Sequence, residues 1–301
     1  MKENGHIADG RGPDGVPTVA YRPGAGRPPG LEILGLPELA ARAAERGRPL
    51  TRAARPAFHL VIAVRGGSLR CSVDLTGHRL AAGDWLWVWP GQVLRFPDGP
   101  GACDAAVLVF PTGFPGGATD ALIRHGEHLA QRLVTPGPER QAALLGLLDA
   151  LVAEAADLGD LPLDAYLQTL RDLLSVLLIR LVHLADPRRG ARTGDSEAFR
   201  RFREAVEDGF RRTHRVADYA ARLGYSRRTL TRATRAALGC GAKRFLDDRV
   251  LLEAKRLLIH TSLAPSAIGE RTGFAHPTAF SSFFRQHTGM TPSEFRSVTQ
   301  P

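Results

Sequence analysis

The chain has 301 residues, of which 44% are hydrophobic and 24% are charged, so it is long enough for two domains with a core each. Its most apolar segment, residues 165–185, is interrupted by Arg171, Asp172 and Arg180. Residues 1–30 contain no positively charged region followed by an apolar one. We therefore expect neither a secretory signal nor a membrane-spanning helix, and no membrane partner.

The positive charge is concentrated in the last third of the chain. Residues 188–301 hold 22 Lys and Arg against 11 Asp and Glu, a net charge of +11, whereas residues 1–187 hold 18 against 20, a net charge of −2. A strongly basic domain attached to a nearly neutral body is typical of a protein that binds a polyanion.

The cysteine content indicates the compartment. The three cysteines are Cys71, Cys103 and Cys240, and their number and spacing give neither a disulfide framework nor a zinc site. We expect buried thiols in a cytoplasmic protein, with no metal and no cofactor.

The first part of the chain changes character near residue 30. Residues 1–30 are rich in Gly and Pro, which predicts a disordered segment. Between Phe58 and Val109, short segments of alternating apolar and polar residues are separated by Gly, Asp and Pro. This pattern predicts antiparallel strands, and several short strands favour a β-barrel or jelly roll over residues 31–118.

From about residue 120 the apolar residues follow a helical period. Two leucine-rich helices are predicted near residues 139–158 and 163–185, within a helical segment of residues 119–186. In the second helix six leucines alternate spacings of three and four, as in the seam of a coiled coil: Leu167, Leu170, Leu174, Leu177, Leu181 and Leu184. The seam predicts a homodimer contact. The alternative is a helix buried entirely within its own subunit.

Residues 187–196 are predicted to be a linker, and a helix-turn-helix follows it. Apolar residues keep helical spacing on both sides of Gly224, the residue type that most easily ends a helix in the left-handed conformation. Ser226 stands at the N-cap of the second helix. If Leu230 and its apolar neighbours face inward, an outward face remains that suits a major groove: Arg228, Thr231, Arg232 and Arg235.

The same arrangement recurs about fifty residues later. Gly273 matches Gly224, Phe280 matches Leu230, and Gly289 lies nine residues after Phe280, as Gly239 lies nine after Leu230. Pro277 suits the first helical position. The corresponding outward residues are Thr278, Ser281, Ser282 and Arg285. One amphipathic helix over residues 242–258 is predicted to join the two units. A solvated basic face would explain one such helix, but not the duplication of turn and outward face.

These residues carry a family resemblance. The stretches GYSRRTLTR, RVLLEAKRLL and GFAHPTAFSSFFRQHTGMTPSEFR resemble the AraC/XylS-type DNA-binding domain over residues 197–298. The resemblance implies a bacterial transcriptional regulator, usually an activator, that places two recognition helices in successive major grooves of double-stranded DNA and acts with RNA polymerase. The expected fold class is α+β, with a β-barrel and following helices linked to an all-α domain, residues 197–301, that holds two helix-turn-helix units.

The resemblance also assigns roles to side chains. It implies that base edges are contacted by Arg228, Thr231, Arg232, Thr278, Ser281 and Ser282. Phosphate contacts, which position without specifying, are expected from Ser226, Arg227, Thr229, Arg235 and Arg285. In two places the chain departs from the family: Ser282 stands where Arg is frequent, and His276 stands where Asp or Ser usually caps the helix. The first unit is therefore expected to specify the DNA sequence more strongly than the second.

The strand region is similar, more weakly, to the cupin-like sensor barrel that often precedes this domain. Cupins can be metalloenzymes, but a metal site needs two His two residues apart with a Glu soon after. His59 and His78 are the only histidines between Phe58 and Val109, which also lack Glu, so an enzyme is not expected.

The strand region is predicted to form a sensor pocket. Trp85, Trp87 and Trp89 share one face of a strand and can line a cavity for a small-molecule effector. Possible polar anchors are His59, Arg65 and Arg70. The alternative is that the three indoles only pack against the leucine-rich helices.

The sequence therefore predicts a ligand-responsive, homodimeric, sequence-specific transcriptional regulator. Two other functions remain open at this stage. One is a nonspecific or architectural DNA-binding protein, which would use the same basic face. The other is a cupin-type enzyme, which would need a metal ion.

Overall fold

The computed structural model describes residues 16–24, 30–117, 119–120, 123, 133–157, 159, 161–185 and 196–299. Within residues 17–301 the chain divides into two compact units, 17–190 and 191–301. Residues 1–15 and 25–29, in the segment expected to be disordered, lie outside the described residues, as do residues 186–195, which include most of the expected linker.

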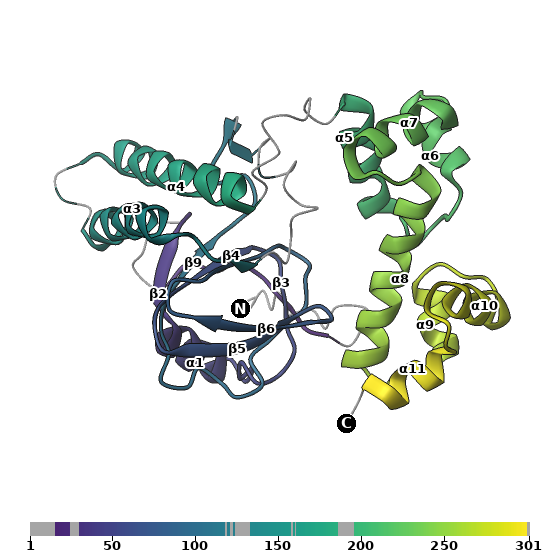
Figure 1. Ribbon diagram of the computed structural model, residues 1–301, viewed down its shortest axis with the longest axis horizontal. Coiled ribbons are helices and arrows are strands. Elements are labelled where there is room, and N and C mark those ends of the chain that lie inside the picture. Colours follow the sequence, from purple (N-terminus) through teal and green to yellow (C-terminus); the bar gives the residue numbers. More distant parts are fainter. Residues whose placement is uncertain are drawn as a thin grey trace, which may run out of the picture. The chain divides into compact units, whose positions relative to one another are not determined.

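In the part that the structure describes, the first unit combines short strands with the helices α1, α3 and α4 (Figure 1). Its strands are β1 Thr18–Val19, β2 Glu32–Gly35, β3 Arg55–Pro56, β4 His59–Gly66, β5 Ser68–Val73, β6 Thr76–Ala81, β7 Trp85–Val88, β8 Leu94–Arg95, β9 Asp104–Phe110 and β10 Leu133–Val134. Its helices are α1 Leu36–Glu45, α3 Pro138–Ala156 and α4 Leu163–Ala185.

Ten described strands form three sheets. Five strands form one sheet in the order β10-β7-β4-β9-β2, three form a second in the order β6-β5-β8, and β1 pairs with β3 in parallel. β4 is the central strand of the large sheet and pairs antiparallel with both β7 and β9. The described strands do not close into the expected barrel, since β10 and β2, the outer strands of the large sheet, are not paired to each other.

Two cores lie on opposite faces of the large sheet, because successive strand residues point to opposite sides. On β4, Val61 and Ala63 belong to the core under the helices. Leu60 and Ile62 belong to the core between the large and small sheets. Strands β4 and β9 are therefore nearly continuous apolar runs and do not alternate with polar residues, because both faces of the sheet are buried.

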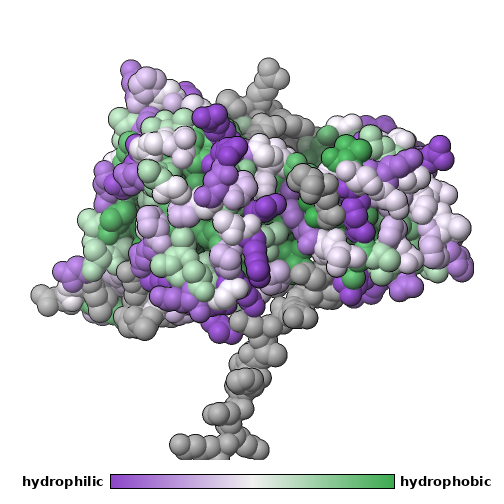
Figure 2. Space-filling model, turned by 90° about the horizontal axis from the view of Figure 1, so that it is seen from below, coloured by the Kyte–Doolittle hydropathy of each residue, from purple (hydrophilic) through white to green (hydrophobic). Residues whose placement is uncertain are grey.

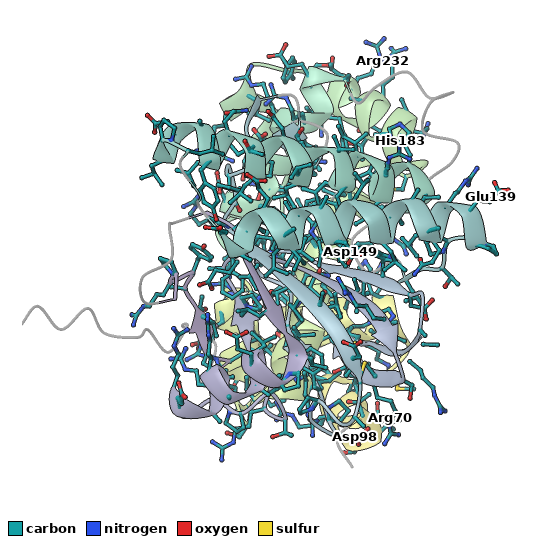
Figure 3. All side chains as sticks on the ribbon, turned by 90° about the vertical axis from the view of Figure 1, so that its left-hand side faces the viewer. Arg70, Asp98, Glu139, Asp149, His183 and Arg232 are labelled. Atoms are coloured by element: carbon teal, nitrogen blue, oxygen red, sulfur yellow. The ribbon has the colours of Figure 1, made fainter. Side chains whose placement is uncertain are left out.

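Helices α3 and α4 lie side by side and cover one face of the large sheet (Figures 1 and 3). They begin and end within two residues of the predicted positions, and Pro138 occupies the first turn of α3, where a missing N–H costs no hydrogen bond.

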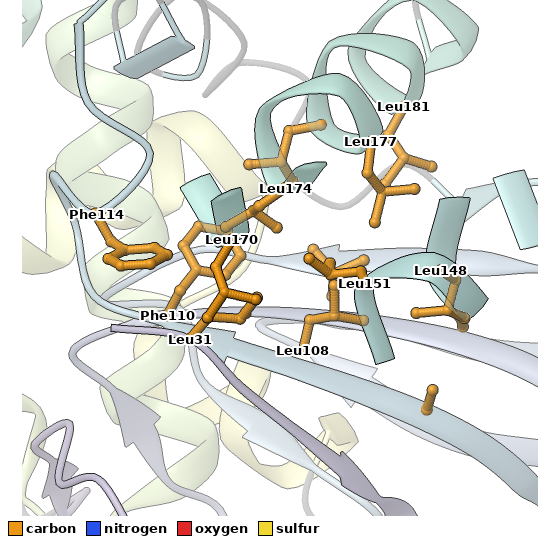
Figure 4. Packing of buried hydrophobic residues seen from close by; sticks show 14 of the residues in the cluster. Leu31, Leu108, Phe110, Phe114, Leu148, Leu151, Leu170, Leu174, Leu177 and Leu181 are labelled. Atoms are coloured by element: carbon orange, nitrogen blue, oxygen red, sulfur yellow. The ribbon is translucent and has the colours of Figure 1, made fainter. Parts of the chain in front are cut away.

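The leucine seam of α4 faces this sheet, and its predicted role as a contact with a second copy is corrected. Leu174 and Leu177 have no exposed surface, and Leu170 and Leu181 are 2% and 3% exposed. Figure 4 shows these four side chains directed at Leu108, Phe110 and Leu151. Leu167 and Leu184 are partly buried against the same core. Leucines at alternating spacings of three and four occur both in coiled coils and in helices buried within one subunit. The sequence alone therefore does not distinguish a homodimer contact from a helix buried in its own subunit.

Three elements at the start of the first unit were not predicted. β1 lies in the segment expected to be disordered, β2 pairs with the end of β9 in the register Glu32 to Val109, and α1 follows β2 directly. Pro37 in the first turn of α1 favours its start.

The second unit is all-α. Its helices are α5 Glu197–Gly209, α6 Val216–Leu223, α7 Arg227–Leu238, α8 Ala242–His260, α9 Pro265–Arg271, α10 Pro277–Thr288 and α11 Pro292–Thr299. Gly224, Gly239 and Gly289 each have a positive φ where a helix ends, which glycine adopts without steric cost. The two predicted helix-turn-helix units are therefore α6–α7 and α9–α10.

The long helix α8 carries both units. Its first half contributes Leu246 and Val250 to the core of the first helix-turn-helix, and its second half contributes Leu257 and Leu258 to the core of the second. Phe280 and Phe284, predicted as core residues, are fully buried.

The surface drawn in Figure 2 carries hydrophilic and hydrophobic residues in small interspersed groups, as expected where a protein faces water. In the part of the chain that the structure describes, every helix is too short or too polar to cross a membrane.

Candidate nucleic-acid interface

The first recognition helix is α7, and its start is fixed by a side-chain cap. The Ser226 hydroxyl accepts a hydrogen bond from the Thr229 backbone N–H at 3.0 Å and lies 2.8 Å from the Thr229 hydroxyl. Leu230, Ala233 and Thr234 are buried. This cap and this buried side set which residues of α7 face outward.

The outward side of α7 carries arginines that no acidic residue neutralises. Arg227, Arg228, Arg232 and Arg235 are exposed, and Figure 3 shows Arg232 directed away from the body of its helix. Among the described residues, none of these four guanidinium groups has an ion pair or a side-chain hydrogen bond. They keep all their donors available for phosphate or base acceptors.

The arginines of helix α8 behave differently. Arg244 pairs with Asp248 at 2.8 Å, and Arg249 pairs with Glu207 at 2.7 Å. The Nη1 atom of Arg256 lies 3.2 Å from the carboxylate of Glu253, which has no exposed surface. The described arginines of α8 are thus paired inside the domain, whereas those of α7 are not.

The unpaired arginines line an open depression of the surface. It is bounded by Val216, Ser226, Arg227, Arg228, Thr231, Arg232, Arg235, Ala236 and Lys243. Six of the residues predicted to contact DNA are therefore brought together in one place. Lys243, at the start of α8, was missed because it lies outside the helix-turn-helix pattern. Its ammonium group also pairs with Asp247.

The second recognition helix, α10, is less basic. Thr278, Ser282 and Arg285 are exposed and Ser281 is partly buried, so the predicted outward face is present with one cation instead of four. His276 occupies the N-cap without a side-chain hydrogen bond to the helix. An imidazole ring is a poorer N-cap than the short oxygen-bearing side chains of Ser, Thr, Asp and Asn, which accept a hydrogen bond from the first turn of the helix.

The loop between α5 and α6 contacts the turn between α9 and α10. The Nε2 atom of His214 lies 2.8 Å from the Thr272 carbonyl, and its ring packs on Phe274 with centroids 4.5 Å apart. At Gly273 a β-carbon would lie 2.5 Å from the Arg211 carbonyl oxygen, so only glycine fits there. Burial lowers the pKa of His214.

The tryptophans predicted to line an effector pocket form a packed cluster. Trp85 is 2% exposed, and its indole N–H donates to Gln141 of α3 at 3.2 Å. Trp87 and Trp89 stack with ring centroids 5.0 Å apart. The three indoles pack against the core under the helices, as the alternative interpretation of their spacing held.

The predicted polar anchors have partners within the chain. His59 is buried, and its Nδ1 atom accepts a hydrogen bond from the Trp87 indole at 3.3 Å. Arg65 pairs with Asp149 of α3 at 2.7 Å. Arg70 pairs with Asp98 at 2.5 Å at the far edge of the unit (Figure 3). All three residues belong to the first unit.

Within the described ranges, no group of three or more His, Cys, Asp and Glu side chains has an arrangement that could hold a metal ion.

Comparisons with known proteins concern mainly the second unit. A family model described as a helix-turn-helix domain matches residues 219–297. The chain is similar to the lactose operon transcription activator of Staphylococcus xylosus, 35% identical over 81 residues, which are 27% of this chain and 29% of that protein. It is also similar to the uncharacterised HTH-type transcriptional regulator YisR of Bacillus subtilis, 25% identical over 60% of each chain.

A third relative is the HTH-type transcriptional activator RhaS of Citrobacter koseri, 27% identical over 48% of this chain and 52% of the relative. The chain thus spans between 29% and 60% of the length of these curated relatives. Among solved structures, ToxT of Vibrio cholerae with bound unsaturated fatty acid aligns with a TM-score of 0.38 at 14% identity, over 89% of this chain and 91% of that one.

The match to the helix-turn-helix model and the similarity to three transcriptional regulators agree with the duplicated turn, cap and recognition helix described above. We conclude that the second unit of this chain belongs to the AraC-type helix-turn-helix domains of transcriptional regulators.

Proposed function

We propose that this protein is a cytoplasmic, sequence-specific transcriptional regulator that binds double-stranded DNA through α7 and α10 and responds to a small-molecule effector through a cupin-like first unit. The observation that carries the proposal is the set of four unpaired arginines on α7, because a duplicated helix-turn-helix leaves these donors on its groove-facing side. RNA polymerase is the partner that follows from such a role.

Base contacts are assigned to Arg228, Thr231 and Arg232 of α7, and to Thr278, Ser281 and Ser282 of α10. Phosphate contacts are assigned to Ser226, Arg227, Thr229, Arg235 and Arg285. A guanidinium can bind the O6 and N7 atoms of guanine together, whereas a serine hydroxyl makes a single hydrogen bond. The contrast between α7 and α10 supports stronger sequence discrimination by the first unit.

A homodimer is also part of the proposal, on a different surface from the buried seam. On the outer side of α4, Val176 and Ile179 are 41% and 38% exposed, and they lie three residues apart on one face of the helix. Exposed aliphatic side chains at this spacing suit a contact with a second copy.

The experiment is an in vitro selection of the full chain from random duplexes, followed by affinity measurements at two salt concentrations. Enrichment of two short boxes about one helical turn, 10–10.5 bp, apart is the expected result. One enriched box would mean that α10 serves as an electrostatic contact only. A uniform, steeply salt-dependent affinity for every duplex would contradict the proposal and favour a nonspecific DNA-binding protein.

A further inference from the structure

The first unit contains a cavity that none of the predicted sensor residues lines. It has a volume of about 130 Å³ and lies between the strands and helix α1, on the face of the large sheet opposite to the tryptophan cluster. Its inner wall is apolar and buried, formed by Leu34, Leu60, Phe96 and Val109 among others. The cavity therefore offers an apolar group a dry environment.

Basic residues surround the outer part of the same cavity. Five arginines line it, against one acidic residue, Glu32. They are Arg22, Arg42, Arg46, Arg48 and Arg52. This local excess of positive charge stands out because residues 1–187 as a whole carry a net charge of −2. A cluster of like charges opposed to the charge of its own domain favours an anionic ligand.

The one acidic residue is already neutralised. Glu32 is 4% exposed, its Oε2 atom lies 3.1 Å from Nη1 of Arg42, and its Oε1 atom accepts a hydrogen bond from the Gly24 N–H. Arg42 binds Glu38 as well, at 2.9 Å. Arg42 and Glu32 thus form a fixed ion pair in the wall.

Two of the arginines have no such partner. Arg46, directly after α1, and Arg52, in the loop before β3, are exposed, and in the described part of the chain their guanidinium groups have neither an ion pair nor a hydrogen bond. Both line the cavity next to its apolar wall. A guanidinium binds a carboxylate through two parallel hydrogen bonds, which neutral groups do not match.

We propose that this cavity binds a small organic carboxylate, with its apolar body inside the cavity and its charge held by Arg46 and Arg52. An apolar protein cavity of roughly 150 Å³ holds a benzene molecule, so the buried part of the ligand is about one six-membered ring or a chain of similar size. The binding site is inferred from the cavity and its arginines alone. Only its role as the effector site rests on the function proposed above.

The test uses isothermal titration calorimetry on the full chain with four probes. Cyclohexanecarboxylate carries both the apolar body and the charge, cyclohexanecarboxamide lacks the charge, acetate lacks the body, and decanoate exceeds the cavity. We expect cyclohexanecarboxylate to bind at least about tenfold more tightly than each of the others, since one missing charge-assisted contact or one missing apolar group costs about that factor. Equal affinity for acid and amide, or tightest binding of decanoate, would overturn the proposal.

Three variants distinguish binding at this cavity from nonspecific attraction of anions to the protein surface. The double variant Arg46→Gln/Arg52→Gln removes the two unpaired charges, and Ala43→Leu, on α1, fills the cavity while keeping a helix-forming residue. Arg79→Gln is the matched control, because Arg79 is exposed on β6 of the same unit and does not line the cavity.

We expect about tenfold weaker binding of cyclohexanecarboxylate by the double variant and by Ala43→Leu, and unchanged binding by Arg79→Gln. An equal loss in Arg79→Gln, or no loss in the double variant, would show attraction of anions by the whole surface and would refute the site. The outcome is independent of DNA binding: carboxylate binding without selected DNA boxes would leave the cavity assigned and refute only its role in regulation.

Discussion

The buried imidazole of His59 is held in its neutral form by its neighbours. Its Nδ1 atom accepts the Trp87 indole N–H, and its ring stacks on Phe110 at 5.0 Å. A charged imidazolium would turn Nδ1 into a second donor facing that N–H and would lose its hydration. Burial accordingly lowers the pKa of His59 to about 3.

This shift predicts a loss of stability in acid. Below pH 6.5 the unfolded chain binds a proton that the folded chain excludes, so the free energy of unfolding falls as pH decreases from 6.5 towards 3. Between pH 7 and pH 5 we expect His59 to account for about 2 kcal/mol of this loss. Urea denaturation at both pH values measures it. His59→Gln should flatten the dependence, whereas His183→Gln, an exposed histidine of α4, should leave it; parallel curves for wild type and His59→Gln would contradict the assignment.

The two recognition helices have different N-cap side chains, Ser226 and His276, which allows a paired test. Ser226→Ala removes the hydrogen bond to the Thr229 N–H and should lower the free energy of unfolding by about 1 kcal/mol. His276→Ala removes no capping hydrogen bond and should change it far less. Thermal denaturation followed by circular dichroism compares them, and an equal effect of both substitutions would show that the Ser226 cap does not stabilise α7.

At the scale of elements, Arg232 of α7 is expected to discriminate between bases, whereas Arg285 of α10 is expected to position the DNA backbone. Arg232→Ala should relax the base preference at one position of the selected site. Arg285→Ala should weaken binding to all sequences alike and reduce the slope of log affinity against log salt by about 1. Selection experiments and salt titrations with both variants measure the two effects, and identical behaviour of the variants would show that the roles are not divided in this way.

Helix α4 has one face in the core and one in contact with water, and the two faces should respond differently to substitution. Leu174→Ala leaves a cavity between α4 and the sheet and should cost about 3 kcal/mol of stability. Ile179→Asp changes an exposed side chain, so it should leave the fold stable and convert the proposed dimer to a monomer. Denaturation and sedimentation equilibrium separate the two outcomes; a stable dimer of Ile179→Asp would exclude this face as the contact.

At the scale of the whole molecule, the two units are expected to unfold separately, because each has its own hydrophobic cores. Differential scanning calorimetry of the full chain should resolve two transitions. Only the transition of the first unit should move to a lower temperature in the Leu174→Ala variant. A single transition that shifts as a whole would show strong coupling between the units.

Local signals made the second unit predictable. Gly224 and Gly289 mark helix ends by a conformation that glycine favours, Ser226 marks a helix start, and the apolar spacing around Leu230 defines a buried face. Each of these features depends on residues close together in the chain. The exposure of the four arginines of α7 could also be predicted, because they occupy the positions of the helix that are not part of its buried face.

The first unit depends on contacts between distant residues, and here prediction reached the strands and the bounds of α3 and α4 but not how they pack together. The pairing of Glu32 with Val109 in the register of β2 and β9 has no local signal. The spacing of the α4 leucines is the same for a coiled coil and for a helix packed on a sheet, so the direction of that face needed the structure. The cavity has no local signal in the sequence, because its walls come from segments as far apart as Val19 and Val109.

Helix α8 is a single unbroken helix of 19 residues without internal Gly or Pro, about 28 Å long, and the recognition helices pack against its two halves. They therefore cannot rotate independently around a duplex. Inserting about five base pairs between two boxes would turn the second box to the opposite side of the DNA, whereas about ten would return it to the same side. In the proposed complex with DNA, helix α8 would make the rotational spacing of the two boxes, as well as their base sequence, a determinant of affinity.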